Sequence, residues 1–548
     1  MSHLFATESN SRAREIAYAE VAKLKPQSTS LIEYQSRGHV IIIANTDAII
    51  ANLDELELLS DSSKSLTSEI IQIKGRPPSS SSRSSSGSSL EQEIIIEGAL
   101  GQFVVHVAGQ KFKADLILDL SPKPILDMSY KPPGYLCSGT EQVDLDKIKI
   151  ELEDLVGTFE KPRYIDYDEN ICAHGRSGKK GCTRCIDACP AEAISSLIDK
   201  IEVDPYRCHG GGICATVCPS SALTYAHPKP KDLLSHVRTL LLSYIEAFKT
   251  IQDELMLKSG GGAIDKKVDL VFVTEEDQTR VEQLLPAALL ITVEEVASVG
   301  PEVWLSALAW GARSVRLFAL DGMPESAQQA LDLHIGMVQK ILISMNFSAN
   351  VVSVVTDPSE LITSAYLSEI VTASHAPLSD KRQAFYMALD YLCKQAEKVN
   401  PVALLPTGSI FGEVIVDKGS CTLCMACVSA CPGNALQDGR EKPQLSFVEA
   451  NCLQCGVCTS TCPENAMTIT PRLLLDRELR QKPRLLHEDT PFCCTSCGKP
   501  FATTSGITTI LTKLAGHSMF TDQRARDRLK MCDDCRVMDM MEDPATDF

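Results

Sequence analysis

The sequence predicts a multidomain α/β protein with two copies of a small α+β module, a small doubly wound α/β domain between the copies, and a metal-binding module at the C-terminal end. Three observations lead to this prediction. Cysteines recur at regular spacing in two separate regions, 172–218 and 421–462. Between these regions, strand-like and helix-like segments alternate over residues 268–357, which is typical of a parallel sheet wound with helices. Two Cys-x-x-Cys pairs follow near the end of the chain.

Length and charge narrow the possible classes of protein. A chain of 548 residues has room for about three to five domains. The 53 basic and 71 acidic residues give a net charge of −18, which argues against binding to nucleic acid or to an anionic membrane surface. We find neither a signal-peptide pattern nor the ~18 apolar residues that a membrane span needs. Since most of the 22 cysteines have metal-type spacing, we expect a cytoplasmic protein without membrane insertion.

Residues 1–135 are expected to form an N-terminal α/β accessory domain. Residues 12–24 have helical character, and 40–43 form an apolar run typical of a buried strand. The serine-rich segment 77–90 cannot bury a core, so we expect a disordered loop there. We find no motif that carries chemistry in this domain.

Residues 406–475 contain the clearest motif of the chain. Two runs follow one another, each with the spacing Cys-x-x-Cys-x-x-Cys-x-x-x-Cys-Pro. This is the spacing of bacterial ferredoxins, in which three cysteines of a run bind one [4Fe–4S] cluster and the fourth binds the other. On this rule one cluster is held by Cys421, Cys424, Cys427 and Cys462. The second cluster is held by Cys452, Cys455, Cys458 and Cys431.

Residues 136–230 form an altered copy of the same dicluster module. Its first run has nine residues, 173–181, inserted between Cys172 and Cys182, and its second run has Gly211 where a cysteine is expected. An internal repeat supports the alignment, because Cys-Pro-x-x-Ala followed by an apolar residue occurs four times, once after each run. The first region is therefore a ferredoxin module that has lost one thiolate.

The crossed rule assigns the thiolates of this altered copy. One [4Fe–4S] cluster is held by Cys172, Cys182, Cys185 and Cys218. Cys189, Cys208 and Cys214 remain for the other cluster. Three thiolates could bind a [3Fe–4S] cluster. They could also bind a cubane whose fourth iron takes water, substrate or a side chain such as His209. The third alternative is that the site is empty. We expect His174 and His209 to be solvent-facing loop residues and not ligands.

Residues 231–405 are expected to combine a long amphipathic helix, over 232–257, with a Rossmann-like α/β domain. This domain has neither a GxGxxG motif nor a phosphate-binding P-loop, so binding of a dinucleotide or a nucleoside triphosphate is not supported. We interpret it as a docking or scaffold domain. A flavin, FAD or FMN, remains possible there, although no motif supports it.

Residues 476–548 hold two Cys-x-x-Cys pairs, which are expected to form a module like a zinc ribbon. The four thiolates are Cys494, Cys497, Cys532 and Cys535. Two such pairs place four thiolates at the corners of a tetrahedron, which is the structural zinc arrangement. The alternative is a fifth iron–sulfur cluster. Cys493 is interpreted as a spare thiol, and the segment between the pairs is expected to contain a helix over 508–515.

Several stretches resemble a family of bacterial 4Fe–4S ferredoxin-type proteins, or polyferredoxins, that are encoded beside molybdenum-dependent formate dehydrogenases. They are Cys172-Ala173-His174, Gly181 to Cys185, Cys421 to Cys427, Asn451 to Gly456, Cys497 to Phe501, and Met531 to Arg536. The likeness extends from about residue 165 to residue 536. The resemblance implies a cytoplasmic electron-transfer or accessory protein for formate oxidation. Gly211 is where this sequence departs from the ferredoxin pattern.

We therefore expect a non-catalytic electron carrier that relays single electrons through about four clusters, between a formate dehydrogenase and another redox protein. The expected cofactors are two to three [4Fe–4S] clusters, one [3Fe–4S] or atypical [4Fe–4S] cluster, and zinc. No catalytic residue is assigned, because no Ser/His/Asp or His-Glu-x-x-His constellation is found. Two alternatives remain open: an assembly or activation factor for a molybdenum formate dehydrogenase, and the iron–sulfur subunit of a flavin-containing oxidoreductase.

Overall fold

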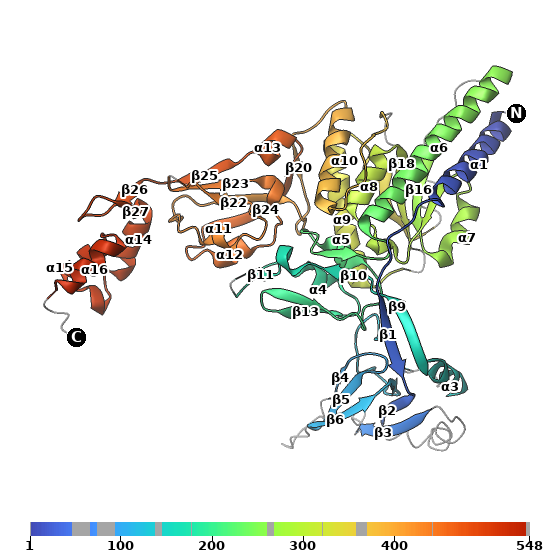
Figure 1. The fold of residues 1–548 in the computed structure, drawn as a ribbon, viewed down its shortest axis with the longest axis horizontal. Coiled ribbons are helices and arrows are strands. Elements are labelled where there is room, and N and C mark those ends of the chain that lie inside the picture. The colour runs from blue at the N-terminus through green and yellow to red at the C-terminus, as the bar shows by residue number, and fades with distance from the viewer. Residues whose placement is uncertain are drawn as a thin grey trace, which may run out of the picture.

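The computed structural model describes residues 2–45, 66–73, 94–137, 145–176, 178–259, 268–319, 322–357, 370–440 and 442–543. The serine-rich segment 77–90 lies outside these residues. The predicted mixed α/β class is confirmed, since helices and strands alternate along most of the chain. In Figure 1 the N-terminal sheet lies at the bottom, the C-terminal module at the far left, the central α/β domain at the upper right, and the two cysteine regions in the middle.

The N-terminal sheet is built around β2 (His39–Asn45), whose residues Ile41, Ile42 and Ile43 are fully buried. Its four parallel strands have the order β3-β2-β7-β8, with β3 (Thr67–Ile73), β7 (Leu116–Asp119) and β8 (Tyr135–Cys137). A second, antiparallel sheet contains β4 (Ile94–Glu97), β5 (Phe103–Val107) and β6 (Gln110–Ala114). The apolar run at 40–43 therefore forms a buried strand, and α3 (Leu145–Asp154) follows this domain.

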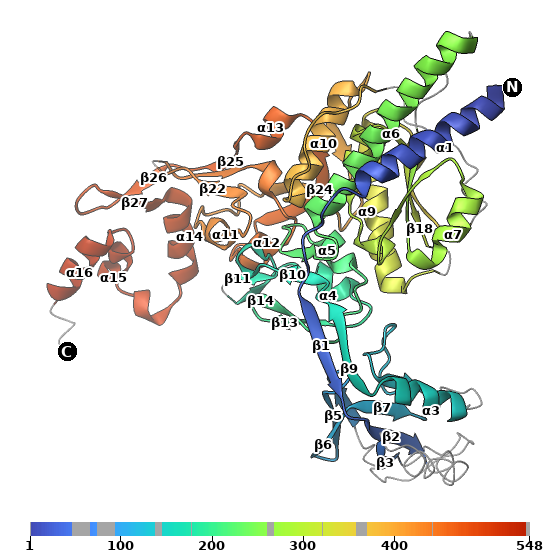
Figure 2. The ribbon, with the colours of Figure 1, turned by 45° about the vertical axis from the view of Figure 1, so that its right-hand side comes forward.

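The first helix, α1 (Ser2–Val21), starts earlier than the expected 12–24 and does not pack on the N-terminal sheet. It lies beside α6 (Pro230–Ser259) in both Figure 1 and Figure 2. The Tyr18 hydroxyl accepts a hydrogen bond from the backbone N–H of Leu290 at 2.8 Å. A two-stranded antiparallel ribbon, β1 (Leu31–Ser36) with β9 (Gly157–Pro162), connects this region to the N-terminal sheet. The segment 1–135 thus contributes to two separate packing regions.

The two cysteine regions share one order of elements, which runs strand, helix, hairpin, helix, strand. The first contains β10 (Ile165–Tyr167), α4 (Arg184–Ala188), β13 (Ile194–Leu197), β14 (Lys200–Val203), α5 (Ile213–Val217) and β15 (Leu223–Tyr225). The second contains β21 (Gly412–Val416), α11 (Ala426–Ala430), β22 (Leu436–Asp438), β23 (Gln444–Phe447), α12 (Val457–Thr461) and β24 (Met467–Leu474). In each module the first strand pairs antiparallel with the last. The insertion 173–181 forms a small hairpin, β11 (Gly175–Arg176) with β12 (Lys179–Lys180).

The residues that lie between the two modules in the sequence form a four-stranded parallel sheet of order β17-β16-β18-β19. Its strands are β16 (Val268–Val273), β17 (Leu289–Thr292), β18 (Ala312–Phe318) and β19 (Val352–Val355). The helices around it are α6, α7 (Glu275–Leu284), α8 (Pro301–Ala309), α9 (Glu325–Ser344) and α10 (Lys381–Gln395). Trp304 and Trp310 are fully buried in its core. This domain supplies the largest apolar core of the described chain, and both modules contact it.

Two strands extend the sheets of the second module. The strand β20 (Val402–Leu404) pairs with β24, and β25 (Arg484–Glu488) pairs with β23. The C-terminal module contains the hairpin β26 (Pro491–Cys493) and β27 (Pro500–Thr503), with α14 (Thr504–Leu514), α15 (Gln523–Arg528) and α16 (Asp533–Met541). The short helix α13 (Arg477–Gln481) precedes it. Among the described residues, no helix is both long enough and apolar enough to cross a membrane.

Candidate iron–sulfur and metal centres

The four cysteines predicted to hold the first cluster of the second module converge. Cys421, Cys424, Cys427 and Cys462 line one small cavity, together with apolar side chains such as Leu445 and Met467. Burial is the main cause that raises the pKa of the Cys427 thiol to about 12, and the neighbouring thiols of Cys424, Cys421 and Cys462 contribute to the shift. Because Cys427 is buried while Cys424 is exposed, this centre, named centre I, reaches the protein surface.

The second group of the module is centre II, formed by Cys452, Cys455, Cys458 and Cys431. Burial is the main cause that raises the pKa of the Cys455 thiol to about 12, with further contributions from Cys452, Cys431 and Cys182. Burial also raises the pKa of the Cys458 thiol, and Cys455, Cys452, Cys431 and Cys427 add to this shift. Centre II lies close to centre I, because α11 with Cys427 packs on α12 with Cys458. It also lies close to the first module, because Arg184 donates to the carbonyl oxygen of Gln454, directly before Cys455.

Centre III brings together the cysteines that the crossed rule assigns in the first module. Cys172, Cys182, Cys185 and Cys218 line a small cavity with Arg184. His174 lies at the same cavity but is only 1% exposed, so the expectation of a solvent-facing His174 is wrong. Its two ring nitrogens lie 2.8 Å from the Cys182 carbonyl oxygen and 2.7 Å from the Ser196 hydroxyl. The ring thus holds the inserted segment, and both of its nitrogens are engaged away from a metal.

Centre IV contains Cys189, Cys208 and Cys214. Burial raises the pKa of the Cys214 thiol, and Cys208, Cys189 and Cys185 raise it further. Centres III and IV are neighbours, because α4 carries Cys185 of centre III and packs on α5, which carries Cys214. His209 is exposed and its ring lies 5.6 Å from the ring of Tyr130, as expected for a loop residue.

The cysteine loops owe their shape to left-handed residues on either side of the second ligand position. In the second module these are Leu423 and Met425 (φ 52° and 60°) in one run, and Gln454 and Gly456 (φ 49° and 80°) in the other. In centre IV the same two positions are Gly210 and Gly212 (φ 83° and 69°). The loop around Gly211 therefore keeps the backbone of a cluster-binding loop although it lacks the thiol. Glycine at both flanking positions makes this conformation sterically free.

The repeated Cys-Pro-x-x-Ala motif has a structural role that the sequence does not reveal. Its fourth residue is left-handed in every copy: Glu192, Ser221, Asn434 and Asn465. In the second module this turn aims the alanine N–H at the sulfur, so that Ala435 donates to Cys431 Sγ and Ala466 donates to Cys462 Sγ, each at 3.3 Å. Hydrogen bonds to the sulfurs of an iron–sulfur cluster are among the features that set its reduction potential.

These donor sets fit iron–sulfur clusters. Thiolates are the soft ligands that such clusters bind, and the thiols of centres I and III each line a small, mostly apolar space. Burial and mutual repulsion oppose ionisation of these thiols in the free protein, and coordination to iron would relieve that cost. Centres I and II are neighbours because α11 packs on α12, and centres III and IV are neighbours because α4 packs on α5. Arg184 contacts both centre III and the ligand loop of centre II, so the centres follow in the order I, II, III, IV.

The C-terminal cysteines form a tighter group. The sulfurs of Cys494, Cys497, Cys532 and Cys535 all lie within 4.8 Å of one another, and those of Cys497 and Cys532 are 3.7 Å apart. Cys493 is exposed and lies outside this group. Burial opposes ionisation of Cys494, but the backbone N–H groups of Cys497, Cys532 and Ser496 outweigh it and lower the pKa of the thiol to about 6. The chain therefore contains a four-cysteine site.

Comparison with protein families agrees with this description. The model of a 4Fe–4S dicluster domain matches residues 420–467, which contain centres I and II. The model of a 4Fe–4S binding domain matches residues 201–224, which contain the run interrupted at Gly211. The comparison with curated proteins gave no match. The chain therefore contains two ferredoxin-type 4Fe–4S domains. Domains of this type indicate an iron–sulfur protein with a role in electron transfer.

Proposed function

We propose that the protein is an electron relay in which single electrons pass along centres I, II, III and IV. The observation that carries this proposal is the position of Arg184, which lies 3.5 Å from the Cys182 sulfur of centre III and donates to the carbonyl oxygen of Gln454, directly before Cys455 of centre II. This contact joins two modules that are separated by about two hundred residues of sequence. A sensor or a simple carrier needs one or two clusters, whereas a continuous row of four supports transport across the molecule. The protein contributes position, burial and hydrogen bonds that tune the clusters.

The proposed partner at one end is a molybdenum-dependent formate dehydrogenase, and another redox protein exchanges electrons at the other end. The support for this partner is the likeness of the cysteine segments to proteins encoded beside such dehydrogenases. The exposed Cys424 of centre I is a natural point of entry or exit, because electron transfer between proteins needs a cluster near the surface.

The test of the relay is anaerobic. The oxidised protein is mixed with the formate dehydrogenase of the same organism, formate is added, and bleaching of the cluster absorbance is followed. We expect rapid, stoichiometric bleaching that requires both the dehydrogenase and formate. The contradicting result is a protein that is reduced normally by dithionite but is not reduced by formate and the dehydrogenase. That result would favour an assembly role or a different electron donor.

For centre IV we propose a [3Fe–4S] cluster. The support is the combination of three converging thiols with a loop whose backbone matches the four-thiol runs but which has glycine at the fourth ligand position. An oxidised [3Fe–4S] cluster is paramagnetic, whereas an oxidised [4Fe–4S] cluster is not. Electron paramagnetic resonance of the oxidised protein, combined with iron counting, therefore tests this composition directly.

For the four-cysteine site we propose structural zinc. A tetrahedron with Zn–S distances of about 2.3 Å has edges of about 3.8 Å, and the Cys497 and Cys532 sulfurs are 3.7 Å apart. A cubane would hold the sulfurs farther apart, because the cluster itself lies between them. Bound zinc would supply folding energy to a module that has few buried apolar residues of its own.

A further inference from the structure

We propose that Arg184 and Arg382 form a bridge between the two ferredoxin modules that holds centres II and III together and raises the reduction potentials of both. The proposal rests on the electron relay and names the residues that control its central step. In that step one cluster is oxidised by one electron while its neighbour is reduced by one, and neither a proton nor a bond is exchanged.

Arg184 begins α4 in the first module and extends into the second. Its side chain donates to the backbone carbonyl oxygens of Gly408 at 3.4 Å, Ser409 at 3.3 Å and Gln454 at 3.0 Å. The same guanidinium lies 3.5 Å from the Cys182 sulfur of centre III. Gln454 stands directly before Cys455 of centre II. Arg184 therefore contacts a ligand of one centre and the ligand loop of the other.

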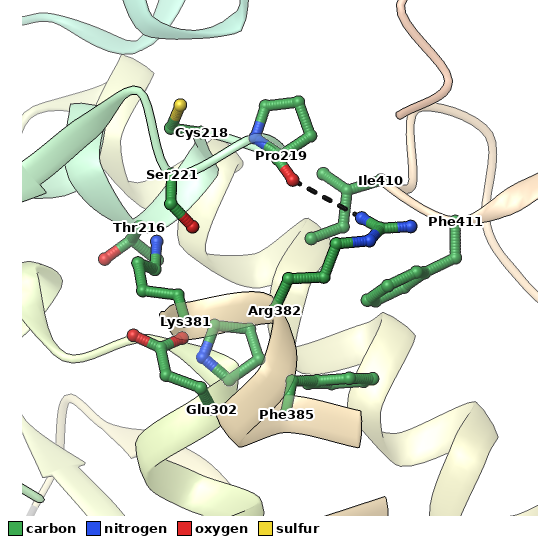
Figure 3. A pocket seen from close by; sticks show the side chains of 11 residues that line it. Thr216, Cys218, Pro219, Ser221, Glu302, Lys381, Arg382, Phe385, Ile410 and Phe411 are labelled. Carbon is green, nitrogen blue, oxygen red and sulfur yellow. Dashed lines mark hydrogen bonds between the residues drawn. The ribbon is translucent and has the colours of Figure 1, made fainter. Parts of the chain in front are cut away.

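Arg382 makes the second connection from α10 of the central domain. It donates to the carbonyl oxygens of Ala450 at 3.0 Å and Cys452 at 2.6 Å, on the second module. It also donates to the carbonyl oxygen of Pro219, at 3.3 Å, directly after Cys218 of centre III. Figure 3 shows the guanidinium between Pro219 and the ring of Phe411, and its carbon lies 4.6 Å from the centre of that ring. Arg382 thus links both modules to the domain between them.

The surroundings of the two arginines favour an anionic neighbour. Both side chains are partly buried. Within the part of the chain that the structure describes, their hydrogen bonds go to carbonyl oxygens, to the Cys182 sulfur and to the Tyr386 hydroxyl, and none goes to a carboxylate. A partly buried guanidinium without such a partner is stabilised by negative charge nearby. A cubane with four thiolates is a dianion when oxidised and a trianion when reduced. The two cations therefore lower the repulsion between centres II and III and favour the reduced state of each.

Each arginine also places hydrogen-bond donors in a planar fork that a lysine cannot reproduce. The difference between arginine and lysine therefore allows the effect of charge and the effect of hydrogen-bond geometry to be measured separately. The positive charge should set the reduction potentials, and the fork should set the contact between the modules. We therefore compare the full-length Arg184→Gln, Arg184→Lys, Arg382→Gln and Arg382→Lys proteins. Arg238→Gln is the matched control, because Arg238 also donates to two backbone carbonyls, at His375 and Ser374, and neither acceptor belongs to a ferredoxin module.

Three measurements are made on each protein after anaerobic reconstitution. Iron and labile sulfide are counted to establish that the clusters are assembled. The reduction potentials are measured by redox titration with electron paramagnetic resonance. Amide hydrogen exchange is followed in the contact segments 406–411 and 450–456. We expect the glutamine variants to lower the potential of at least one cluster and to raise exchange in these segments by about tenfold or more, because hydrogen bonds from charged donors are lost.

The lysine variants should have reduction potentials close to those of the wild type, but their contact segments should exchange amide hydrogens as fast as those of the glutamine variants. The bridge is disproved if both glutamine variants match Arg238→Gln in potential and in exchange. The claim that the positive charge raises the reduction potentials is disproved if the lysine and glutamine variants lower the potentials equally. Failure of the relay has a separate signature: the wild-type protein would not accept electrons from a redox partner, while the titrations and exchange still report on the two arginines.

Discussion

The backbone around Gly211 follows the other cysteine loops residue by residue, with left-handed conformations at Gly210 and Gly212. Gly211 itself is not left-handed, and a β-carbon built on it meets only the Tyr130 ring, at 3.8 Å. A side chain is therefore sterically acceptable at this position. The missing thiol is a local substitution in an otherwise intact cluster loop.

This geometry predicts the result of Gly211→Cys. The new thiol would complete a set of four with Cys189, Cys208 and Cys214, so the oxidised protein should lose the paramagnetic [3Fe–4S] signal and gain one iron. Gly516→Cys is the control, since a β-carbon there meets no atom within 4 Å and Gly516 belongs to the C-terminal module. If the signal and the iron count are unchanged in Gly211→Cys, the assignment of centre IV is wrong.

The register of the four-cysteine site is tested by a pair of adjacent residues. Cys494 belongs to the group of close sulfurs and Cys493 does not, so Cys494→Ser should lose bound zinc while Cys493→Ser should keep one zinc per chain. Loss of a group that only supports a metal ligand already costs about 10- to 100-fold in metal affinity, so loss of a ligand should cost at least as much. Metal content by mass spectrometry after dialysis measures this. Equal retention in both variants would argue against zinc coordination by Cys494.

The inserted hairpin β11 and β12 lies between the two modules. Gly181, which follows it, has no room for a side chain: a β-carbon would lie 2.3 Å from Val457 Cγ2, 2.8 Å from the Ala173 carbonyl oxygen and 3.3 Å from the Cys455 carbonyl oxygen. The Ser460 hydroxyl donates to the Lys180 carbonyl oxygen at 3.3 Å. An insertion that appears in the sequence as a departure from the ferredoxin pattern thus contributes to the contact between centres II and III.

We predict that Gly181→Ala separates this contact. Overpacking of a close interface costs about 1–3 kcal/mol, so the variant should lose cluster absorbance at a lower denaturant concentration than the wild type. Gly336→Ala in α9 is the control, because its β-carbon would meet only Pro406, at 4.0 Å, and alanine favours a helix. A Gly181→Ala protein with wild-type resistance and wild-type exchange in segment 450–456 would contradict the close packing.

Considered as a whole, the molecule uses the central α/β domain to place two ferredoxin modules side by side. Lys381 at the start of α10 donates to the Ala215 carbonyl oxygen of the first module, and Ser326 of α9 donates to that of Ala188 at 3.3 Å. Arg382, next to Lys381, contacts the second module. The described part of this domain carries no dinucleotide motif, and the first turn of α7 holds Glu275, Glu276 and Asp277. These carboxylates would repel a phosphate there, which favours the scaffold interpretation over a nucleotide or flavin site.

Short-range patterns made several features predictable. Ligand loops are specified within a few residues by the cysteine spacing and by the turn after each Cys-Pro, so the sequence predicts four groups of thiols. The cysteines of centres I and III line common cavities, and the ligand sets of all four centres stay predictions. Strand β2, helix α6 and the parallel strands of the central domain also follow apolar periodicity. The prediction that His174 faces solvent was wrong. The sequence shows that His174 lies in an insertion, but it does not show that the imidazole ring hydrogen-bonds the Ser196 hydroxyl.

Which cysteines form a group was thus decided by local sequence, because a ligand loop needs only its own residues to adopt its shape. The order of the groups was decided by the tertiary structure. The docking of α1 on the central domain, the hydrogen bond from Ser460 to the Lys180 carbonyl oxygen, and the carbonyls that surround Arg184 and Arg382 all join segments far apart in the chain. Such contacts depend on the summed packing of whole domains, which no short window of sequence contains.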